Sequence, residues 1–366
     1  MNRADIEQNI LKAIPKQKRV RLHLAPRFGK TKLMIQVIQR DDPQTILWVT
    51  PSRQLADNDI PNEFKKWDAE EYLPKLEVTT WSALKNHTGK YDLIVLDEEQ
   101  FATEANCHQI LKSALKGRII TMTGTPSTRE DKTDLYRAMR MQVAYQLSID
   151  EAVALGIVSD YNITVFYVQM DETQNIEKES KGLVFYTSEA EHYQRINRKA
   201  TSFYGGSHNT IPWAIAERTR LIKNSPTKKE LAKRIIYHKC TGRSLIFAPF
   251  IDYAEALCPA TYHSKSESKI ALEQFQAGTI NQLAIVNAGA VGFTFRGIEQ
   301  LLIVQMDSNK TGLSTQKISR ALLKEENKSV EIYVLCLRDT QDEKWVREGL
   351  KEFDSTKIKT IQANLT

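Results

Sequence analysis

The stretch that most constrains this chain is residues 21–33, RLHLAPRFGKTKL. A short apolar run leads into a polar turn, and a segment with helical apolar periodicity follows it. This order predicts a strand, a tight turn and a helix whose first backbone N–H groups face a bound anion. Gly29 permits close approach of the backbone, the Lys30 ammonium suits a β- or γ-phosphate, and the Thr31 hydroxyl suits Mg²⁺.

The phosphate-binding pattern is incomplete. Leu24 stands where G-x-x-x-x-G-K-[ST] has its first glycine. A structural strand-to-helix turn with a solvated lysine has the same local sequence, so the choice depends on the rest of the chain.

Length and composition predict two soluble domains. The chain has 366 residues, which is too long for one typical hydrophobic core. Its content of 41% hydrophobic and 26% charged residues is typical of soluble globular proteins. No apolar run reaches the roughly 20 residues that cross a bilayer, and a charge at the third residue argues against a secretory signal. Four widely spaced cysteines favour a reduced, cytoplasmic setting over a zinc site or disulfide framework. The net charge of +6 permits a polyanionic partner without requiring one.

Apolar β-rich runs alternate with helical segments along the chain, and each run ends in a polar loop. This alternation predicts parallel sheets flanked by helices, with ligands at the carboxyl ends of the strands. The first half has such runs at residues 20–24, 45–50, 76–80, 91–96 and 118–122. A second cycle begins near Tyr161, so we expect an α/β fold with domains 1–160 and 161–366.

The second domain begins with a region of mixed character. Residues 171–181 are expected to form a charged loop, and residues 188–223 to be mostly helical. Gly205, Gly206 and Pro212 are expected to interrupt that helical stretch.

An acidic pair follows the apolar run at residues 91–96. Asp97 at this position suits Mg²⁺ binding, and Glu98 suits the orientation or deprotonation of an attacking water. An acid-rich helix start is the structural alternative. A G-K-T earlier in the same predicted domain favours the catalytic interpretation.

Arg320 is a candidate arginine finger that would stabilise charge on a γ-phosphate. A helix-surface arginine is the alternative, and the predicted phosphate turn favours the finger.

Taken in order, these segments resemble the superfamily 2 helicases and translocases over nearly the whole chain. Eight motifs carry the resemblance. They are motif I (residues 25–31), Ia (50–53), Ib (79–82), II (97–100), III (123–126), IV (244–250), V (287–297) and VI (316–323).

The resemblance implies two tandem RecA-like domains, each a mainly parallel sheet flanked by helices, with a nucleotide cleft between them. It implies an ATP hydrolase of the DNA helicase type that uses ATP and Mg²⁺. The residues it assigns to catalysis are Lys30, Asp97, Glu98, Gln100 and Arg320. Those it assigns to nucleotide binding are Gln8, Arg27, Gly29, Lys30, Thr31, Gly292 and Gln316, with Thr31 and Asp97 also holding Mg²⁺. Those it assigns to nucleic-acid contact are Pro51, Arg53, Thr80, Thr123, His263 and Asn287.

The chain departs from the family pattern at three positions. Arg27 replaces a usual glycine of motif I, and Gln100 stands where His or Asp is commoner. Motif VI has Arg320 but no second arginine, and Lys324 is the nearest substitute.

Residues 319–335 and the two-domain length resemble UvsW-type phage recombination and repair helicases. The resemblance implies a monomer that acts on single-stranded or branched DNA in the cytoplasm, or in the host cytoplasm if the protein is viral. No membrane partner is expected. An RNA helicase, or a duplex translocase that does not separate strands, is the alternative.

Overall fold

The computed structural model describes residues 3–15, 19–126, 130–180, 182–201, 210–263, 265–266, 269–286, 295–307, 313–325 and 328–365. The chain forms two compact units. The first is residues 1–160 with 309–326, and the second is residues 161–308 with 327–366. The motif order assigns residues 309–326 to the second domain, whereas their contacts group them with the first unit.

The first unit is built on a six-stranded sheet in the order β3-β2-β4-β5-β1-β6, in which all neighbouring strands are parallel. Because the strands are parallel, the loops that follow β1, β4 and β5 lie at one edge of the sheet. The strands are β1 (Val20–Leu24), β2 (Ile46–Thr50), β3 (Leu76–Thr80), β4 (Tyr91–Asp97), β5 (Ala114–Thr123) and β6 (Gln142–Leu147). The helices are α1 (Arg3–Ala13), α2 (Lys30–Asp41), α3 (Ile60–Lys66), α4 (Glu104–Ser113), α5 (Glu130–Ala138), α6 (Ile149–Ala154) and α12 (Leu313–Ser319).

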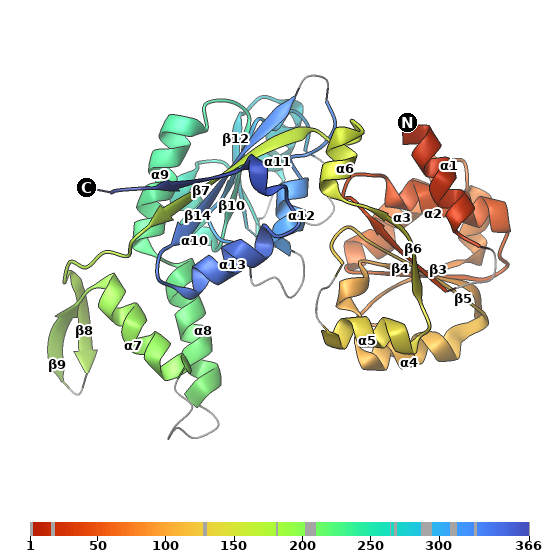
Figure 1. Ribbon diagram of the computed structural model, residues 1–366, viewed down its shortest axis with the longest axis horizontal. Helices are drawn as coiled ribbons and strands as arrows, with labels where there is room; N and C mark the ends of the chain where they lie inside the picture. The colour runs from red at the N-terminus through yellow and green to blue at the C-terminus, as the bar shows by residue number, and fades with distance from the viewer. Residues whose placement is uncertain are drawn as a thin grey trace. The chain divides into compact units, whose positions relative to one another are not determined.

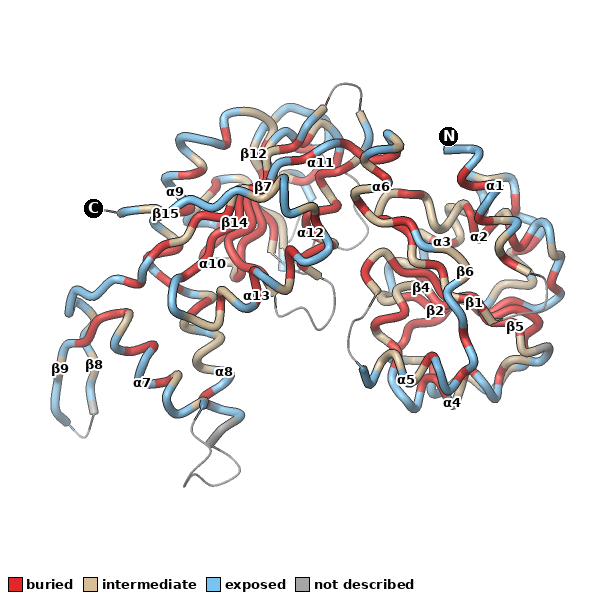
Figure 2. Tube along the Cα trace, in the orientation of Figure 1, coloured by how far each residue is buried: buried red, intermediate tan, exposed pale blue. Residues whose placement is uncertain are grey.

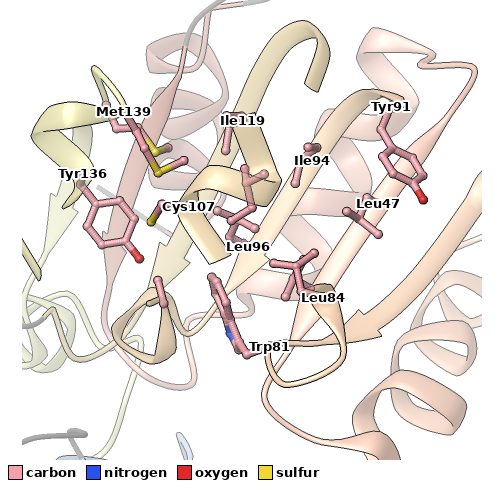
Figure 3. Close-up of a cluster of buried hydrophobic side chains, with 14 residues drawn as sticks. Leu47, Trp81, Leu84, Tyr91, Ile94, Leu96, Cys107, Ile119, Tyr136 and Met139 are labelled. Atoms are coloured by element: carbon pink, nitrogen blue, oxygen red, sulfur yellow. The ribbon is translucent and has the colours of Figure 1, made fainter. Parts of the chain in front are cut away.

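A hydrophobic cluster covers one face of this sheet (Figure 3). Leu47 of β2 and Leu96 of β4 contribute to it from the sheet, and Cys107 of α4 and Tyr136 of α5 from the helices. Trp48 points to the opposite face, because successive strand residues alternate in direction, and its ring meets Phe64 of α3 at 6.0 Å between centroids. Both faces of the sheet are therefore packed.

The second unit is built on a seven-stranded sheet in the order β11-β12-β10-β13-β14-β7-β15. Its strands are β7 (Asp160–Val168), β10 (Ser244–Ala248), β11 (Thr261–Tyr262), β12 (Gln282–Val286), β13 (Gln300–Ile303), β14 (Ser329–Leu337) and β15 (Ile358–Gln362). Its sheet-associated helices are α9 (Pro226–Lys239), α10 (Ile251–Leu257), α11 (Ile270–Ala277) and α13 (Gln341–Gly349). In both units the buried residues concentrate along the central strands (Figure 2).

Four further elements of the second unit extend away from its seven-stranded sheet (Figure 1). They are β8 (Ile176–Ser180), β9 (Leu183–Thr187), α7 (Glu189–Thr201) and α8 (Thr210–Lys223). The expectation of a charged loop over 171–181 is wrong for residues 176–180, which form β8 and pair antiparallel with β9. Pro212 does not interrupt α8. It lies in the first turn, where backbone N–H groups have no partner within the helix.

The expected fold class, two α/β units with mainly parallel sheets, is confirmed. Among the helices of the described residues, none combines the length and apolar character needed to cross a membrane.

Candidate functional site

The turn after β1, which the sequence predicts to bind phosphate, contains two residues with a left-handed backbone. Gly29 has a φ of 95° at the start of α2, and Arg27 has a φ of 68°. A left-handed φ costs little for glycine and is strained for other residues. The fold therefore holds Arg27 in a backbone conformation that favours glycine.

Helix α1 covers this turn through Arg3. The Arg3 guanidinium donates a hydrogen bond to the carbonyl of Phe28, and an ideal Cβ on Gly29 would lie 2.6 Å from Arg3 Nη2. Glu7, one helical turn along α1, accepts from Arg3 Nε at 3.2 Å and pairs with Lys32 Nζ at 2.9 Å. The carboxylate of Glu7 therefore ties α1 to the first turn of α2, and the Arg3 cation lies against the turn expected to hold phosphate.

The acidic pair at the end of β4 faces the lysine of this turn. Lys30 Nζ lies 3.4 Å from Glu98 Oε1, and an ideal Cβ on Gly124 would lie 3.1 Å from the same nitrogen. Glu98 has a φ of 54°, another left-handed conformation at a non-glycine residue. Burial, and next the Glu98 carboxylate, raise the pKa of Asp97 to about 7, while Lys30 opposes the rise.

Gln100 joins the acidic pair to the loop after β5. Its Nε2 donates to Glu98 Oε2 at 2.9 Å and to Thr125 Oγ1 at 3.1 Å. Thr123 is fully buried, and its hydroxyl donates to Gln100 Oε1 at 2.8 Å. Thr123, expected to contact nucleic acid, is thus surrounded by the acidic loop in this structure. Gln100 therefore links Glu98 to the loop after β5 through hydrogen bonds.

Glu99 points away from this edge into a buried ion-pair network. Its carboxylate accepts from Arg21 Nη2 at 2.6 Å and lies 3.3 Å from His23 Nε2; the Thr121 hydroxyl also donates to it. Burial alone would raise the pKa of Glu99, but hydrogen bonds from His23 and Arg21 and the Arg21 charge lower it to about 2. The network connects β1, which leads to the phosphate turn, with the loop that carries Glu98.

The hydrophobic core also holds the acidic loop through its backbone. The Trp81 indole donates to the Asp97 carbonyl at 2.9 Å, and the Tyr136 hydroxyl donates to the Glu99 carbonyl. Both aromatic side chains belong to the cluster in Figure 3. Two side chains of the hydrophobic core therefore hold the backbone of the loop that carries the two carboxylates.

The segment after α12 brings Arg320 into the first unit. Arg27 Nε lies 3.5 Å from the carbonyl of Ser319, and Ser159 Oγ donates to the carbonyl of Leu323 at 2.7 Å. Burial, and next the Arg320 charge, lower the pKa of Arg27 to about 10.

Arg320 itself lies within electrostatic reach of the acidic loop. Burial lowers the pKa of Arg320, and the carboxylate of Glu98 opposes this shift. Lys30 and Arg320 therefore both interact with Glu98, and Arg27 lies within electrostatic reach of Arg320.

The other predicted residues have varied surroundings. Gln8 is exposed on α1, Gln316 is half-buried on α12, and Arg53 is exposed after β2. Pro51 is half-buried, and Thr80 is buried, with its hydroxyl 3.0 Å from Ser82 Oγ. His263, half-buried after β11, belongs to the second unit. Asn287 and Gly292 lie outside the described residues.

The donor set at the end of β4 fits Mg²⁺. Burial, and next the neighbouring Glu98 carboxylate, raise the pKa of Asp97, and a divalent cation bound beside the two carboxylates would favour their charged forms. Mg²⁺ commonly takes one or two protein carboxylates and completes its octahedron with water and substrate phosphates. Asp97 and the Thr31 hydroxyl at the start of α2 are the residues that would hold it.

The comparisons with known proteins give a likeness in structure only. No protein-family model and no curated protein matches the sequence. The DNA-bound ATP-dependent Type ISP restriction-modification enzyme LlaBIII is similar at a TM-score of 0.63 and 13% identity, over 99% of this chain and 31% of that one. This chain thus spans about a third of the length of that enzyme.

Two further structures are similar over most of both chains. The Pyrococcus furiosus Hef helicase domain has a TM-score of 0.51 at 13% identity, covering 94% of this chain and 96% of that one. S. cerevisiae Dbp5 bound to RNA and ADP BeF3 has a TM-score of 0.57 at 12% identity, covering 98% and 89%. The chain therefore has the fold of superfamily 2 helicase and ATPase domains, with two tandem RecA-like units.

Sequence patterns did not reveal the residues that position the site. Arg21 and His23 alternate with apolar neighbours in β1, which is the sequence signal of side chains on the other face of a strand. Glu99, the third acid in a row, is buried where the first two are partly exposed. Arg3 gave no such signal, because its contact with the phosphate turn depends on the tertiary position of α1.

Proposed function

We propose that this protein is an ATP-dependent nucleic-acid motor of the superfamily 2 type, in which ATP hydrolysis drives movement along a strand. The observation that carries the proposal is the convergence of Lys30, Glu98 and Arg320 at the carboxyl edge of the first sheet. A phosphate turn, an acidic pair and a second cation at one edge are the parts that phosphoryl transfer to water requires.

Each side chain has a distinct task in this proposal. Lys30 and the N–H groups at the start of α2 bind the phosphates, Glu98 orients the attacking water, and Arg320 stabilises charge on the terminal phosphoryl group. Mg²⁺, held by Asp97 and Thr31, would supply charge neutralisation at the phosphate oxygens.

Coupling to nucleic acid would run through Gln100. This side chain bonds Glu98 on one side and Thr125 on the other, so a change at the carboxylate reaches the loop after β5. We propose that this loop, with the exposed Arg53, communicates with a bound strand through its phosphates. Such binding would be sequence-tolerant and sensitive to salt.

We propose DNA as the strand, with recombination or repair as the setting and the cytoplasm as the compartment. One structurally similar protein is bound to DNA and another to RNA, so RNA is the second candidate. Movement along duplex without strand separation is the second candidate mode of action.

The deciding experiment is the rate of ATP hydrolysis with single-stranded DNA, single-stranded RNA, duplex DNA and forked DNA. We expect stimulation by DNA that declines with added salt. Strand displacement, measured beside tracking along duplex, separates a helicase from a translocase. Hydrolysis that none of the four polymers stimulates would overturn the motor.

The Arg320→Ala substitution tests the arginine finger. We expect the turnover number to fall by at least about 10²-fold, because a finger acts on charge that develops during phosphoryl transfer. Affinity for ATP, measured with a fluorescent analogue, should change by only a few-fold. Arg137→Ala, at an exposed arginine of α5, is the matched control and should change neither quantity. Equal losses of turnover and affinity would assign Arg320 to ground-state binding instead.

A further inference from the structure

Helices α7 and α8 form a projection from the second unit that the proposed ATP chemistry does not use. The two helices pack side by side beyond the sheet (Figure 1). Arg218 Nη1 donates to Asn197 Oδ1 at 3.0 Å and fixes the register of one helix against the other. The projection is anchored at its base by buried Glu189, whose carboxylate accepts from the hydroxyls of Ser225 and Thr227. Its position in the second unit is therefore well defined.

One side of α7 is buried against the rest of the second unit, and three of its cationic side chains are exposed. His192, Tyr193 and Ile196 are buried at helical spacing. Arg195, Arg198 and Lys199 of the same helix are exposed.

Helix α8 carries one exposed aromatic residue and one exposed cation. Trp213 is 55% exposed, and Arg220, seven residues along and on the same side of the helix, is also exposed. We call the set Arg195, Arg198, Lys199, Trp213 and Arg220 the basic α7–α8 face. An indole with this exposure forgoes burial that would otherwise stabilise the fold, which is typical of a binding residue.

The charge balance of the projection selects its partner. Helices α7 and α8 together carry six Lys and Arg against three Asp and Glu, a net charge of +3, half of the +6 of the whole chain. One of the three acids, Glu189, is buried and bonded at the base, so the outer surface is more basic still. Guanidinium and ammonium groups beside an exposed aromatic ring fit a phosphodiester backbone with bases that stack.

We propose that the basic α7–α8 face is a second nucleic-acid contact, separate from the phosphate edge, which binds a single strand through its phosphates and stacks a base on Trp213. This rests on the proposed motor function and adds to it a named surface. Binding here needs no nucleotide, because none of its residues belongs to the first unit. The face would hold the strand while the first unit exchanges ADP for ATP.

The test is nucleotide-free binding of a fluorescent oligodeoxynucleotide over a range of salt concentrations. The triple variant Arg195→Gln, Arg198→Gln, Lys199→Gln should lower the slope of log K against log[salt] by about 2, at about 0.7 per phosphate contact. The same three contacts correspond to a loss of affinity of about 50-fold at 0.15 M salt. Trp213→Ala should weaken binding by at least about fivefold with the salt slope unchanged, since stacking releases no counterions.

Matched controls come from the same unit. Lys233→Gln, Lys239→Gln, Lys344→Gln removes three exposed cations from α9 and α13, and Tyr237→Ala removes an aromatic residue that is 81% exposed. Both should bind like the wild type, and all variants should keep the basal rate of ATP hydrolysis. Parallel titrations with single-stranded RNA and duplex DNA identify the polymer.

The outcomes separate this inference from the motor function. If DNA stimulates hydrolysis but the triple variant binds with wild-type affinity and salt slope, the basic α7–α8 face is not a nucleic-acid contact. The face is likewise excluded if the control triple loses as much affinity as the α7 triple, because net charge alone would then explain the loss. Strand binding that requires this face without any stimulated hydrolysis would support the contact and overturn the motor.

Discussion

The substitution Lys30→Ala is expected to abolish ATP hydrolysis while leaving the first unit folded. Lys30 Nζ lies 3.4 Å from Glu98, so its ammonium faces the expected water-activating carboxylate. Removal of one preorganised charge of this kind typically costs about 10²–10³ in turnover. The measurement is the steady-state ATPase rate with saturating DNA, together with the melting temperature.

Glu98→Gln provides the second arm of this prediction. The amide keeps the shape of the side chain but cannot accept a proton, and loss of general-base assistance costs about 10²–10⁴. Lys66→Ala, at an exposed lysine of α3 in the same unit, should retain full activity. Turnover retained by Lys30→Ala would remove the phosphate-turn assignment, and with it the proposed ATPase.

The second large effect is expected at Glu99, which positions the site without facing the nucleotide. Its side chain is 1% exposed, so Glu99→Gln leaves the Arg21 cation beside an amide that cannot balance its charge. Breaking a buried ion pair from one side costs about 3–5 kcal/mol. We expect this loss of stability to appear as faster hydrogen exchange in β1, β4 and β5. ATP turnover should fall in parallel, because the loop that carries Glu98 is no longer held in place.

A double substitution distinguishes the cost of leaving one buried charge without its partner from the cost of changing the shape of the site. Arg21→Met with Glu99→Leu removes both charges, and the destabilisation should be much smaller than for either single change. Glu348→Gln, in the exposed pair with Lys344 on α13, is the surface control and should cost no more than about 1 kcal/mol. A similarly small cost for Glu99→Gln would show that the network does not support the fold.

The same network predicts a pH dependence with a definite sign. Glu99 has a pKa of about 2 in the folded protein, against an ordinary value of 4.5. Its ionised carboxylate therefore stabilises the folded protein fully at pH values above 4.5. The contribution is about 3 kcal/mol at neutral pH, and it is lost as the pH falls from about 4.5 to about 2. Hydrogen exchange in β1 between pH 6 and pH 3 should show this loss in the wild type but not in Glu99→Gln.

The fold class and the order of the chemistry could be predicted from the amino-acid pattern without coordinates. Alternating apolar runs and helical segments require parallel sheets, since a parallel strand needs a crossover that only a long connection provides. The carboxyl ends of parallel strands share one edge, so Lys30, Asp97 and the loop after β5 could be expected near one another. Strands with weaker patterns were missed: β6 is mostly exposed along its length, and β15 follows a segment with helical spacing.

Which side chains meet depended on the packing of the chain in three dimensions. The pairing of Arg21 with Glu99, the cover of Arg3 over Gly29 and the grouping of residues 309–326 with the first unit all join positions far apart in the sequence. Local spacing cannot encode such contacts, because they depend on the order of strands in a sheet and on where a helix packs against it. The burial of Glu99 beside the half-buried Glu98 has the same cause: one turn of backbone, with Glu98 at a φ of 54°, sends consecutive carboxylates to opposite sides.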